Sequence, residues 1–571
     1  MKALVDALRA LGGKIVVPRL KHKLERFEAR LTDAPRVQRE LLFSKVRRAA
    51  SSAFGRDHGF ASIRSLEDFR RQVPIAGYEY YWPYIDRVTK GEIGAMFPAG
   101  DRLLMFTLSS GTTANPKLIP INDVWMKEYR RGFNIWGVKA FLDHPKLFYS
   151  KLAGIAGNWD MRRTPTGLPC GMASGLAARM QNPLIKMVYC VPAPVFEIDD
   201  PDVKYYTALR LSLSEPTGMF TTATPATVVN FAKLGDRYKE SLIRDIRDGD
   251  CRPPKELPTE TRRAITSRIV KKNPERAKEL EAIVARTGHL YPKDYWDLHL
   301  VACWLGGTVG GYARHIAEYY GDVPRRDIGL LCSEGRFTIP MEDETPAGVL
   351  EISSHYYEFI PEAEIDSKQP VVLEAHELEV GKDYYILLTT SCGLYRYHIS
   401  DVLRCVGFRG QAPVLEFLNK GQRFSDMEGE KISEHQLVQA ATESSEKVGL
   451  RLSAFTAVPV RPEANGESTP PYYALAVEAP EVADQSAARR FLTAVDEWLS
   501  QNNVMYAGKR SDGYLGPPRL VCIPEGSWKA YDQAEIARRG VGEDHYKHPS
   551  LVMDEGFLER FERMGEVRVN S

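Results

Sequence analysis

Residues 103–122 constrain the fold of this chain more than any other segment. The apolar run Leu103–Leu108 predicts a buried strand, and a second apolar run begins after Lys117. Gly111 lies between them, and its missing Cβ allows a ligand to approach the backbone closely. Hydroxyl side chains surround this glycine at Ser109, Ser110, Thr112 and Thr113. Because hydroxyls and amides at a strand end form an anion nest, and Lys117 adds a movable positive charge, the segment predicts a polyphosphate site.

The composition of this turn also fits a solvent-exposed loop, since such clusters commonly mark turns. It is not the phosphate loop of the nucleoside triphosphatases, because no second glycine precedes Lys117 and no hydroxyl follows it. The order of residues in Thr107–Asn122 resembles instead the phosphate-binding loop of adenylate-forming enzymes. The Leu-Ile-Pro continuation at 118–120 is typical of one branch, the Gretchen Hagen family of acyl acid amido synthetases.

Length and charge narrow the class of protein. A chain of 571 residues exceeds the size at which a single core keeps growing, so we expect two or more domains. The 76 basic and 75 acidic side chains nearly cancel, which argues against nucleic acid or an anionic membrane as a partner. The expected partner is therefore a small molecule.

The eight cysteines are scattered without Cys-x-x-Cys pairs or the spacing of a zinc site, which predicts reduced, buried thiols. Charges interrupt residues 1–30 too often for a secretory segment, and no run of about 18 apolar residues occurs. We expect a cytoplasmic protein; its oligomeric state is not readable from the sequence.

Strand-like runs alternate with helical segments, as at Ile328–Leu331 and Tyr385–Leu388, which predicts an α/β fold with ligands at the strand ends. A change of composition near 417–431 suggests a hinge. We therefore predict a large domain at 1–420, a hinge at 421–432 and a small α+β lid at 433–571. The resemblance implies that the large domain is the adenylate-forming one, with mixed sheets and flanking helices, and that the lid is mobile.

A second cluster ends at Glu334, where an apolar strand runs into a carboxylate. Magnesium takes hard oxygen ligands and otherwise relies on water and substrate phosphates, so Glu334 is a candidate metal ligand; a loop-capping role is the alternative. The family has an aromatic-Ala-Ser-Ser-Glu motif here. This chain has Leu330-Leu-Cys-Ser-Glu334, which keeps Ser333 and Glu334 and loses the aromatic residue.

The segment Thr389–Asp401 is closely similar to the family signature Gly-Leu-Tyr-Arg-Tyr-x-x-x-Asp. A carboxylate accepts two hydrogen bonds, so Asp401 can bind both ribose hydroxyls of a nucleotide, as the family's aspartate does. An aspartate that closes a turn is the alternative. We assign no catalytic task to Arg396, which has a structural alternative as well.

The segment His355–Pro361 resembles the family's Gly-Tyr-Phe-Glu-Phe-x-Pro. Tyr356 or Tyr357 could stack on adenine, although an aromatic strand is more often core. A glycine-rich segment that includes Gly306, Gly307 and Thr308 could lie against the acyl group. We also predict that residues from 167–175 and from 220–225, including Thr222, line the pocket for the acid.

Two lysines near the hinge and the C-terminus match family contexts. Lys431 lies in Glu-Gly-Glu-Lys-Ile-Ser-Glu, and Lys547 lies in Tyr-Lys-His-Pro. A lysine delivered by domain closure could neutralise charge on the α-phosphate, although most lysines are surface residues. Where plant members have Gly-Arg before the hinge, this chain has Asn-Lys, so Lys420 could supply the charge without the planar arginine fork.

Together the motifs predict a ligase that uses ATP and Mg²⁺ to convert a carboxylic acid to an acyl-adenylate and then transfers the acyl group to an amine. The resemblance implies an amino acid as the amine. Lys547, Lys431 and Lys117 are the candidate catalytic residues. Two alternatives remain: a ligase that forms a thioester with coenzyme A, and a nucleotide-binding relative without turnover.

Overall fold

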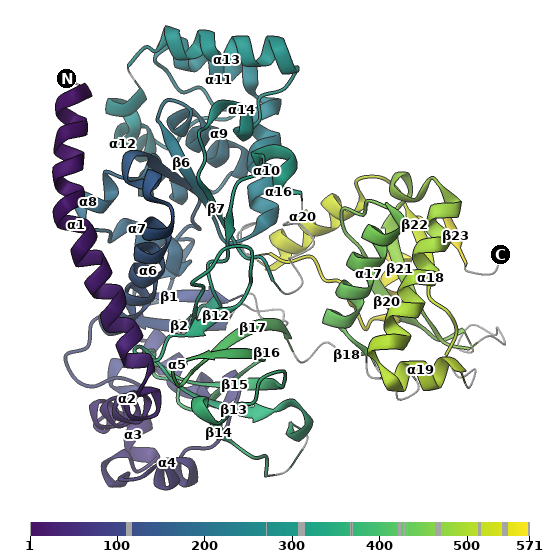
Figure 1. Cartoon of the computed structure of the whole chain (residues 1–571). Helices are drawn as coiled ribbons and strands as arrows, with labels where there is room; N and C mark the ends of the chain where they lie inside the picture. The colour runs from purple at the N-terminus through teal and green to yellow at the C-terminus, as the bar shows by residue number, and fades with distance from the viewer. Residues whose placement is uncertain are drawn as a thin grey trace. The chain divides into compact units, whose positions relative to one another are not determined.

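The computed structural model of this protein is divided by its internal contacts into two units (Figure 1). It describes residues 2–109, 117–269, 271–306, 315–365, 367, 369–420, 424–425, 427, 430, 432–462, 470–511, 515–539 and 546–568. Within this part of the chain, the first unit takes its residues from 1–399 and 403–417, and the second from 400–402, 418–539 and 546–568.

The first unit contains a sheet built around the predicted strand at 103–108. Its strand order is β2 (Lys117–Asn122), β1 (Leu103–Ser109), β5 (Pro169–Gly171) and β4 (Arg162–Arg163). Strands β1 and β2 are antiparallel, with Leu108 opposite Leu118 and Ser109 opposite Lys117. The two apolar runs therefore pair with each other, and the hydroxyl-rich segment separates them in the sequence.

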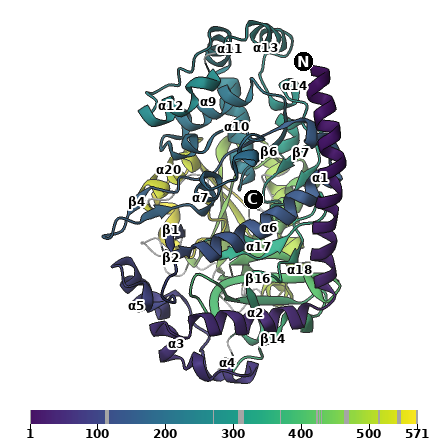
Figure 2. The same cartoon turned by 90° about the vertical axis from the view of Figure 1, so that its left-hand side faces the viewer.

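A second sheet of this unit is parallel and has the order β3 (Lys151–Gly154), β6 (Thr217–Thr221), β7 (Leu300–Ala302) and β8 (Arg325–Arg326). Helices surround it in Figures 1 and 2. These are α9 (Pro201–Ser212), α10 (Pro225–Arg237), α11 (Lys239–Asp248), α12 (Thr259–Ile269), α13 (Pro274–Thr287), α14 (Pro292–Tyr295) and α16 (Ile316–Tyr320). Apolar residues of the strands and helices form one buried cluster, which leaves the strand ends available for polar groups.

A longer sheet has the order β11 (Thr338–Ile339), β12 (Gly348–Leu350), β17 (Ala412–Lys420), β16 (Tyr397–Arg409), β15 (Asp383–Thr389), β13 (Tyr356–Pro361) and β14 (Leu373–Glu374). Helix α2 (Ala34–Ala49) packs against β13 and buries Val37, Leu42 and Val46, which lie at helical spacing. The other helices of the N-terminal part are α1 (Lys2–Leu31), α3 (Ala53–Asp57), α4 (Leu66–Gln72), α5 (Tyr78–Thr89), α7 (Ala173–Arg179) and α8 (Pro183–Lys186).

Helix α6 (Asp123–Asp143) follows β2 directly. Asn122 is its N-cap and accepts a hydrogen bond from the Trp125 backbone at 2.8 Å. Met126, Tyr129 and Trp136 are buried in the core that also receives β1. The helix therefore begins at the end of β2 opposite to the one that adjoins the predicted phosphate loop.

The prediction of a strand at Ile328–Leu331 is wrong in its bounds. The observed strand, β9, covers only Leu331–Cys332 and pairs with β10 (Gly335–Arg336). Gly329 has φ +89°, a left-handed conformation that interrupts an extended strand, and a Cβ there would lie 2.3 Å from the Thr338 carbonyl oxygen. The apolar character of this segment reflects burial and not a continuous strand.

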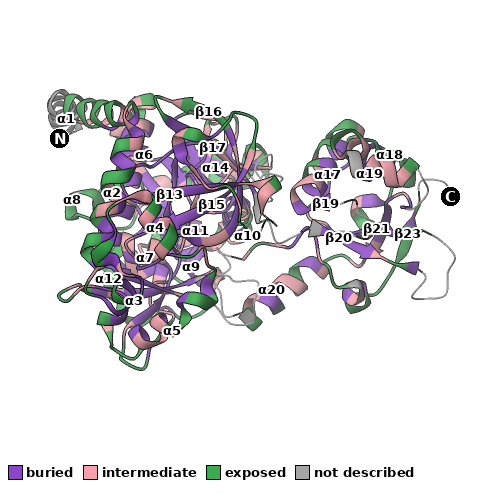
Figure 3. Cartoon of the chain, turned by 90° about the horizontal axis from the view of Figure 1, so that it is seen from below, coloured by how far each residue is buried: buried purple, intermediate pink, exposed green. Residues whose placement is uncertain are grey.

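The second unit has its own sheet, ordered β20 (Thr456–Val460), β21 (Tyr472–Glu478), β22 (Arg519–Ile523) and β23 (Gly565–Val567), with the short pair β18 (Phe424–Ser425) and β19 (Ile432–Ser433). Its helices are α17 (Glu434–Val448), α18 (Gln485–Asn502), α19 (Val504–Ser511) and α20 (Ser527–Arg539). Figure 3 shows buried residues inside each unit and exposed ones on the outer helix faces. Over the described residues, we find no helix with the length and apolarity needed to cross a membrane.

Candidate active site

The end of the β1–β2 pair brings Lys117 and Glu334 to the same tyrosine. The Lys117 Nζ atom lies 5.4 Å from the centroid of the Tyr78 ring. The Tyr78 hydroxyl accepts a hydrogen bond from the Leu118 backbone at 2.9 Å and donates to its carbonyl at 3.3 Å. Burial raises the pKa of Tyr78 to about 12, and the negative charge of Glu334 adds to this shift. The phenol therefore stays neutral at neutral pH.

Glu334 occupies the turn between β9 and β10. Its backbone carbonyl accepts a hydrogen bond from the indole Nε1 of Trp125 at 2.7 Å and a weak one from the Cys392 thiol at 3.9 Å. The Thr107 hydroxyl donates to the carbonyl of the neighbouring Ser333 at 3.4 Å, which ties this turn to β1. Sequence reasoning missed Trp125, because an apolar helix position gives no sign of a specific hydrogen bond.

The Glu334 side chain fits a magnesium ligand. Its residue is 6% exposed, and its carboxylate has no hydrogen bond or ion pair with a described residue. A buried, unpaired carboxylate is costly unless a cation or donor approaches it. Within the described residues no group of three or more His, Cys, Asp or Glu side chains could hold a metal. A single carboxylate suits magnesium, which keeps several waters and binds substrate phosphates.

The carboxyl edge of the parallel sheet forms the second part of the site. Thr222 follows β6 directly, is 4% exposed, and has a hydroxyl without a hydrogen-bond partner among the described residues. Gly306 follows β7 and lies so close to Pro346 that a Cβ would come within 2.5 Å of the proline Cβ. In open α/β sheets, ligands bind outside the carboxyl ends of the strands, which supports the predicted substrate role of this edge.

Several residues that the sequence predicts for the site are described only in part or lie outside the described residues. Ser109 is described as the last residue of β1, without its side chain, and Lys420 as the last residue of β17, also without its side chain. The remaining ones are Ser110, Gly111, Thr112, Thr113, Gly307, Thr308 and Lys431. Their predicted roles stay predictions.

Tyr356 and Tyr357 are buried in the core of the first unit, at 1% and 0% exposure. The Tyr357 hydroxyl donates to the Glu351 carbonyl at 3.2 Å, and the Tyr356 ring meets Phe69 edge to face. Stacking on adenine would require one ring to be uncovered, so this role stays a prediction. Asp401 lies on β16 and is 2% exposed, and Lys547 is exposed in the second unit. Their nucleotide and catalytic roles stay predictions too.

Arg396, in the Gly-Leu-Tyr-Arg-Tyr motif, makes hydrogen bonds that support the fold. Its Nε donates to Glu358 at 2.9 Å, and its Nη1 donates to the carbonyls of Arg70 and Val73 at 3.1 and 2.9 Å. Its φ of +50° places a non-glycine residue in the left-handed region. The guanidinium is therefore occupied in joining β13 to α4 and the segment after it, which agrees with our decision to assign it no catalytic task.

Arg336, two residues after Glu334 in the sequence, is a buried cation that the sequence analysis did not predict. Arg336 is 1% exposed, its guanidinium lies 4.2 Å from the centroid of the Phe133 ring, and none of its nitrogens has a hydrogen-bond partner among the described residues. Burial lowers the pKa of Arg336 to about 10, so it remains charged at neutral pH. The glycine and phenylalanine it faces on α6 gave no signal for this contact.

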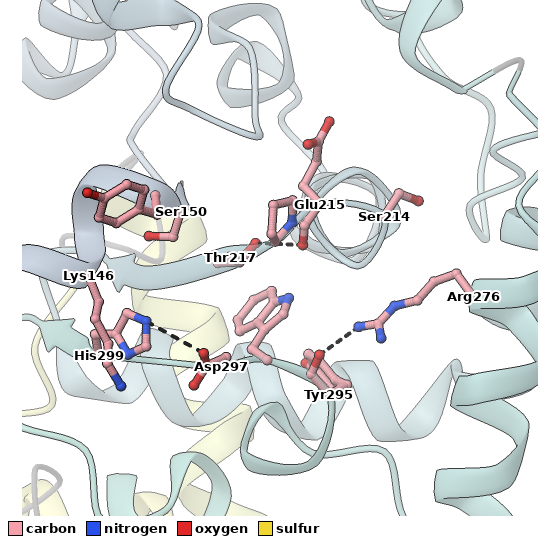
Figure 4. A pocket seen from close by; sticks show the side chains of 12 residues that line it. Lys146, Ser150, Ser214, Glu215, Thr217, Arg276, Tyr295, Asp297 and His299 are labelled. Atoms are coloured by element: carbon pink, nitrogen blue, oxygen red, sulfur yellow. Dashed lines mark hydrogen bonds and ion pairs between the residues drawn. The ribbon is translucent and has the colours of Figure 1, made fainter. Parts of the chain in front are cut away.

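A pocket of about 530 Å³ opens at the opposite, amino edge of the parallel sheet (Figure 4). Lys146, Glu215, Arg276, Asp297 and His299 contribute charge to its wall. Arg276, for example, donates to the carbonyls of Leu213 and Tyr295 and to Glu279. Because this guanidinium is already bonded to protein acceptors, and parallel strands present ligand sites at their carboxyl ends, we do not place the active site here.

The fold of the chain is similar to that of a solved acyl acid amido synthetase. It superposes on the GH3.15 acyl acid amido synthetase with a TM-score of 0.82 at 21% identity, over 96% of this chain and 97% of the other. The predicted fold class is therefore confirmed.

The chain belongs to the GH3 family, the Gretchen Hagen family of the sequence analysis. Residues 23–325 match the GH3 family N-terminal domain, 348–420 its central domain and 435–556 its C-terminal domain. It is 24% identical to "Jasmonoyl--L-amino acid synthetase JAR4" of Nicotiana attenuata, over 93% of each chain. It is 26% identical to "Jasmonoyl--L-amino acid synthetase GH3.5" of Oryza sativa subsp. japonica, over 89% of this chain and 90% of that one.

Proposed function

We propose that this protein is an ATP-dependent acyl acid amido synthetase. The observation that carries the proposal is the cluster of Lys117, Tyr78 and Glu334 at the end of the β1–β2 pair, in a chain of the GH3 family. It combines a cation with a carboxylate that has no partner among the described residues, near the strand ends that lead into the predicted phosphate loop. The carboxylic acid and the amine, which the family suggests is an amino acid, would be small molecules.

In the first step, a carboxylate oxygen of the acid attacks the α-phosphorus of ATP, and the bond to pyrophosphate breaks. Lys117 orients phosphate oxygens by charge, and Glu334 would hold Mg²⁺, which offsets phosphate charge when bound. In the second step, the amine nitrogen attacks the acyl carbon, the bond to AMP breaks, and the amine gives up a proton. Binding and charge stabilisation supply most of the rate, so no covalent enzyme intermediate is needed.

We also propose that Asp401 binds the ribose hydroxyls and that a lysine, Lys547 of the small domain or Lys431 of the hinge, stabilises charge in the first step. The motif contexts support these roles. We keep the boundaries 1–420, 421–432 and 433–571 as part of the proposal, with 421–432 as the hinge.

The test is ATP–pyrophosphate exchange against a panel of carboxylic acids, followed by mass analysis of products with mixed amino acids and with coenzyme A. We expect acid-dependent exchange and an amide product. A thioester formed with coenzyme A, without an amide, would favour an acyl-CoA ligase. Nucleotide binding without exchange for any acid would favour a relative without turnover.

Replacing Glu334 with Gln should lower exchange at least about a hundredfold, because the removed charge is the proposed metal ligand. The dependence of the remaining rate on Mg²⁺ concentration should shift upward. Glu342→Gln, at an exposed position after β11, is the matched control and should behave like the unaltered chain. An unchanged Mg²⁺ dependence in Glu334→Gln would refute the metal assignment.

Replacing Asp401 with Ala should weaken ATP binding by about tenfold, since two hydrogen bonds to a charged group are removed. Isothermal titration with a non-hydrolysable ATP analogue measures this directly. If binding is untouched, the ribose site lies elsewhere.

A further inference from the structure

Asp327, the residue directly after β8, collects backbone N–H groups from two chain segments. Its Oδ2 accepts a hydrogen bond from Leu305 at 2.7 Å, and its Oδ1 accepts one from Gly329 at 2.5 Å. The N–H of Gly306 also donates to this carboxylate. Asp327 is 4% exposed. A buried side chain therefore holds the first residues of the glycine-rich segment that the sequence assigns to the acyl group.

Further hydrogen bonds join these segments at one place. The Trp304 backbone N–H donates to the Ala223 carbonyl at 2.9 Å, and its indole Nε1 donates to the Gly329 carbonyl at 2.9 Å. The Thr222 N–H donates to the Ala302 carbonyl at 3.0 Å. The segments that follow β6, β7 and β8 are therefore joined by hydrogen bonds, and Asp327 supplies the charged acceptor among them. The orphaned hydroxyl of Thr222 lies at the same edge.

The charge state of Asp327 determines how many of these donors it can satisfy. An ionised carboxylate accepts all three N–H groups, whereas a protonated one carries an O–H donor of its own and loses acceptor capacity. Burial raises the pKa of Asp327 to about 7, against the opposing effect of the N–H donors and of the Arg336 charge. The Cys303 thiol is a titratable neighbour, and burial raises its pKa so that it remains neutral.

We propose that Asp327 is a positioning residue: its negative charge holds Leu305 and Gly306 at the carboxyl edge of the parallel sheet, in the geometry that binds the acyl acid. The identity of the ligand rests on the proposed function. The anchoring of the two amides by Asp327 does not depend on that function. Loss of the charge should release these amides and raise the KM for the acid more than it lowers kcat.

The anchor is tested without any substrate, by hydrogen–deuterium exchange of the Leu305 and Gly306 amides in the full chain, resolved by fragmentation. In Asp327→Asn, we expect these amides to exchange about tenfold faster than in the unaltered chain at about pH 8, because the charged acceptor is gone. Asp322→Asn, an exposed aspartate in the connection before β8, is the control. Equal exchange in Asp327→Asn and the control would overturn the proposal.

The substrate role is tested by the pH dependence of ATP–pyrophosphate exchange. In the unaltered chain, the KM for the acid should rise about tenfold between about pH 8 and pH 6, with a smaller change in kcat. In Asp327→Asn, KM should be high and flat over this range, while Asp322→Asn should follow the unaltered chain. A pH profile of Asp327→Asn that follows the unaltered chain would overturn the substrate role. If no acid supports exchange in any variant, the proposed function fails, and the amide measurement still decides the anchor.

Discussion

At the scale of single residues, the site depends on contacts that have no sequence signature. The motif predicts Glu334 as a metal ligand, but its backbone is held by a hydrogen bond from Trp125, a residue that the sequence analysis did not single out. Asp327 and Arg336 are similar cases, since each is a charged side chain that the fold buries. Their roles depend on which strand ends the fold brings together.

Replacing Trp125 with Phe should lower both stability and activity. The change removes the hydrogen bond to the Glu334 carbonyl and part of a buried side chain, so we expect a loss of about 2 kcal/mol in the free energy of unfolding. Exchange activity should fall about tenfold, because the carboxylate is held less firmly. Urea unfolding and pyrophosphate exchange measure the two effects.

Trp296→Phe is the matched control. Trp296 is also buried and donates its indole N–H to a backbone carbonyl, that of Ser212 at 3.4 Å, but it lies at the amino edge of the parallel sheet. It should lose comparable stability and keep its activity. Equal activity losses in both variants would mean that Trp125 acts through stability alone.

At the scale of elements, a buried ion pair connects α2, α6 and the segment after β15. The Lys45 Nζ atom donates to Glu128 at 2.7 Å and to the Ser391 hydroxyl at 2.6 Å, and Ser391 donates to Glu128 at 2.9 Å. Both charged side chains are nearly inaccessible. These contacts, more than 80 residues apart in sequence, help to fix α6, which carries Trp125.

Lys45→Met should destabilise the chain by about 3–5 kcal/mol, because it leaves the Glu128 carboxylate buried without its cation. The double variant Lys45→Met/Glu128→Met should recover most of this loss, since no charge remains buried. Lys127→Met, which removes an exposed ion pair with Asp123 on the same helix, should change stability by less than about 1 kcal/mol. Chemical unfolding of the four chains measures this; a double variant as unstable as Lys45→Met would contradict it.

At the scale of the whole molecule, each unit has its own buried cores, and the apolar clusters of the second unit are formed by its own strands and helices. Folding stability also depends on buried titratable groups. His355 is 0% exposed, its ring nitrogens have no hydrogen-bond partners among the described residues, and burial holds its pKa well below the usual value.

The sign of the resulting pH dependence follows from proton linkage. Below about pH 6.5, the unfolded chain takes up a proton at His355 that the folded chain does not, so stability is lost as pH falls, by at most about 1.4 kcal/mol per pH unit. Asp327 has the opposite effect. Because its pKa is raised in the folded chain, the free energy of unfolding falls as pH rises from about 4 to about 7.

The His355 contribution can be isolated by a difference measurement. The difference in unfolding free energy between the unaltered chain and His355→Gln should shrink as pH falls from about 7 to about 5, because the variant lacks the titrating ring. The exposed His22→Gln should show a constant difference. A constant difference for His355→Gln as well would mean that the ring is not held neutral in the folded state.

The sequence by itself determined the family, the fold class and most elements, because periodicity, caps and motifs are local. The strands at 103–109 and 383–389 lie where the apolar pattern indicates. Only the tertiary structure decided that Gly329 interrupts the apolar run at 328–331, that Tyr356 and Tyr357 are buried, and that Asp327 reaches Leu305. Burial and hydrogen bonds between strand ends depend on which distant segments meet, and no local pattern records that.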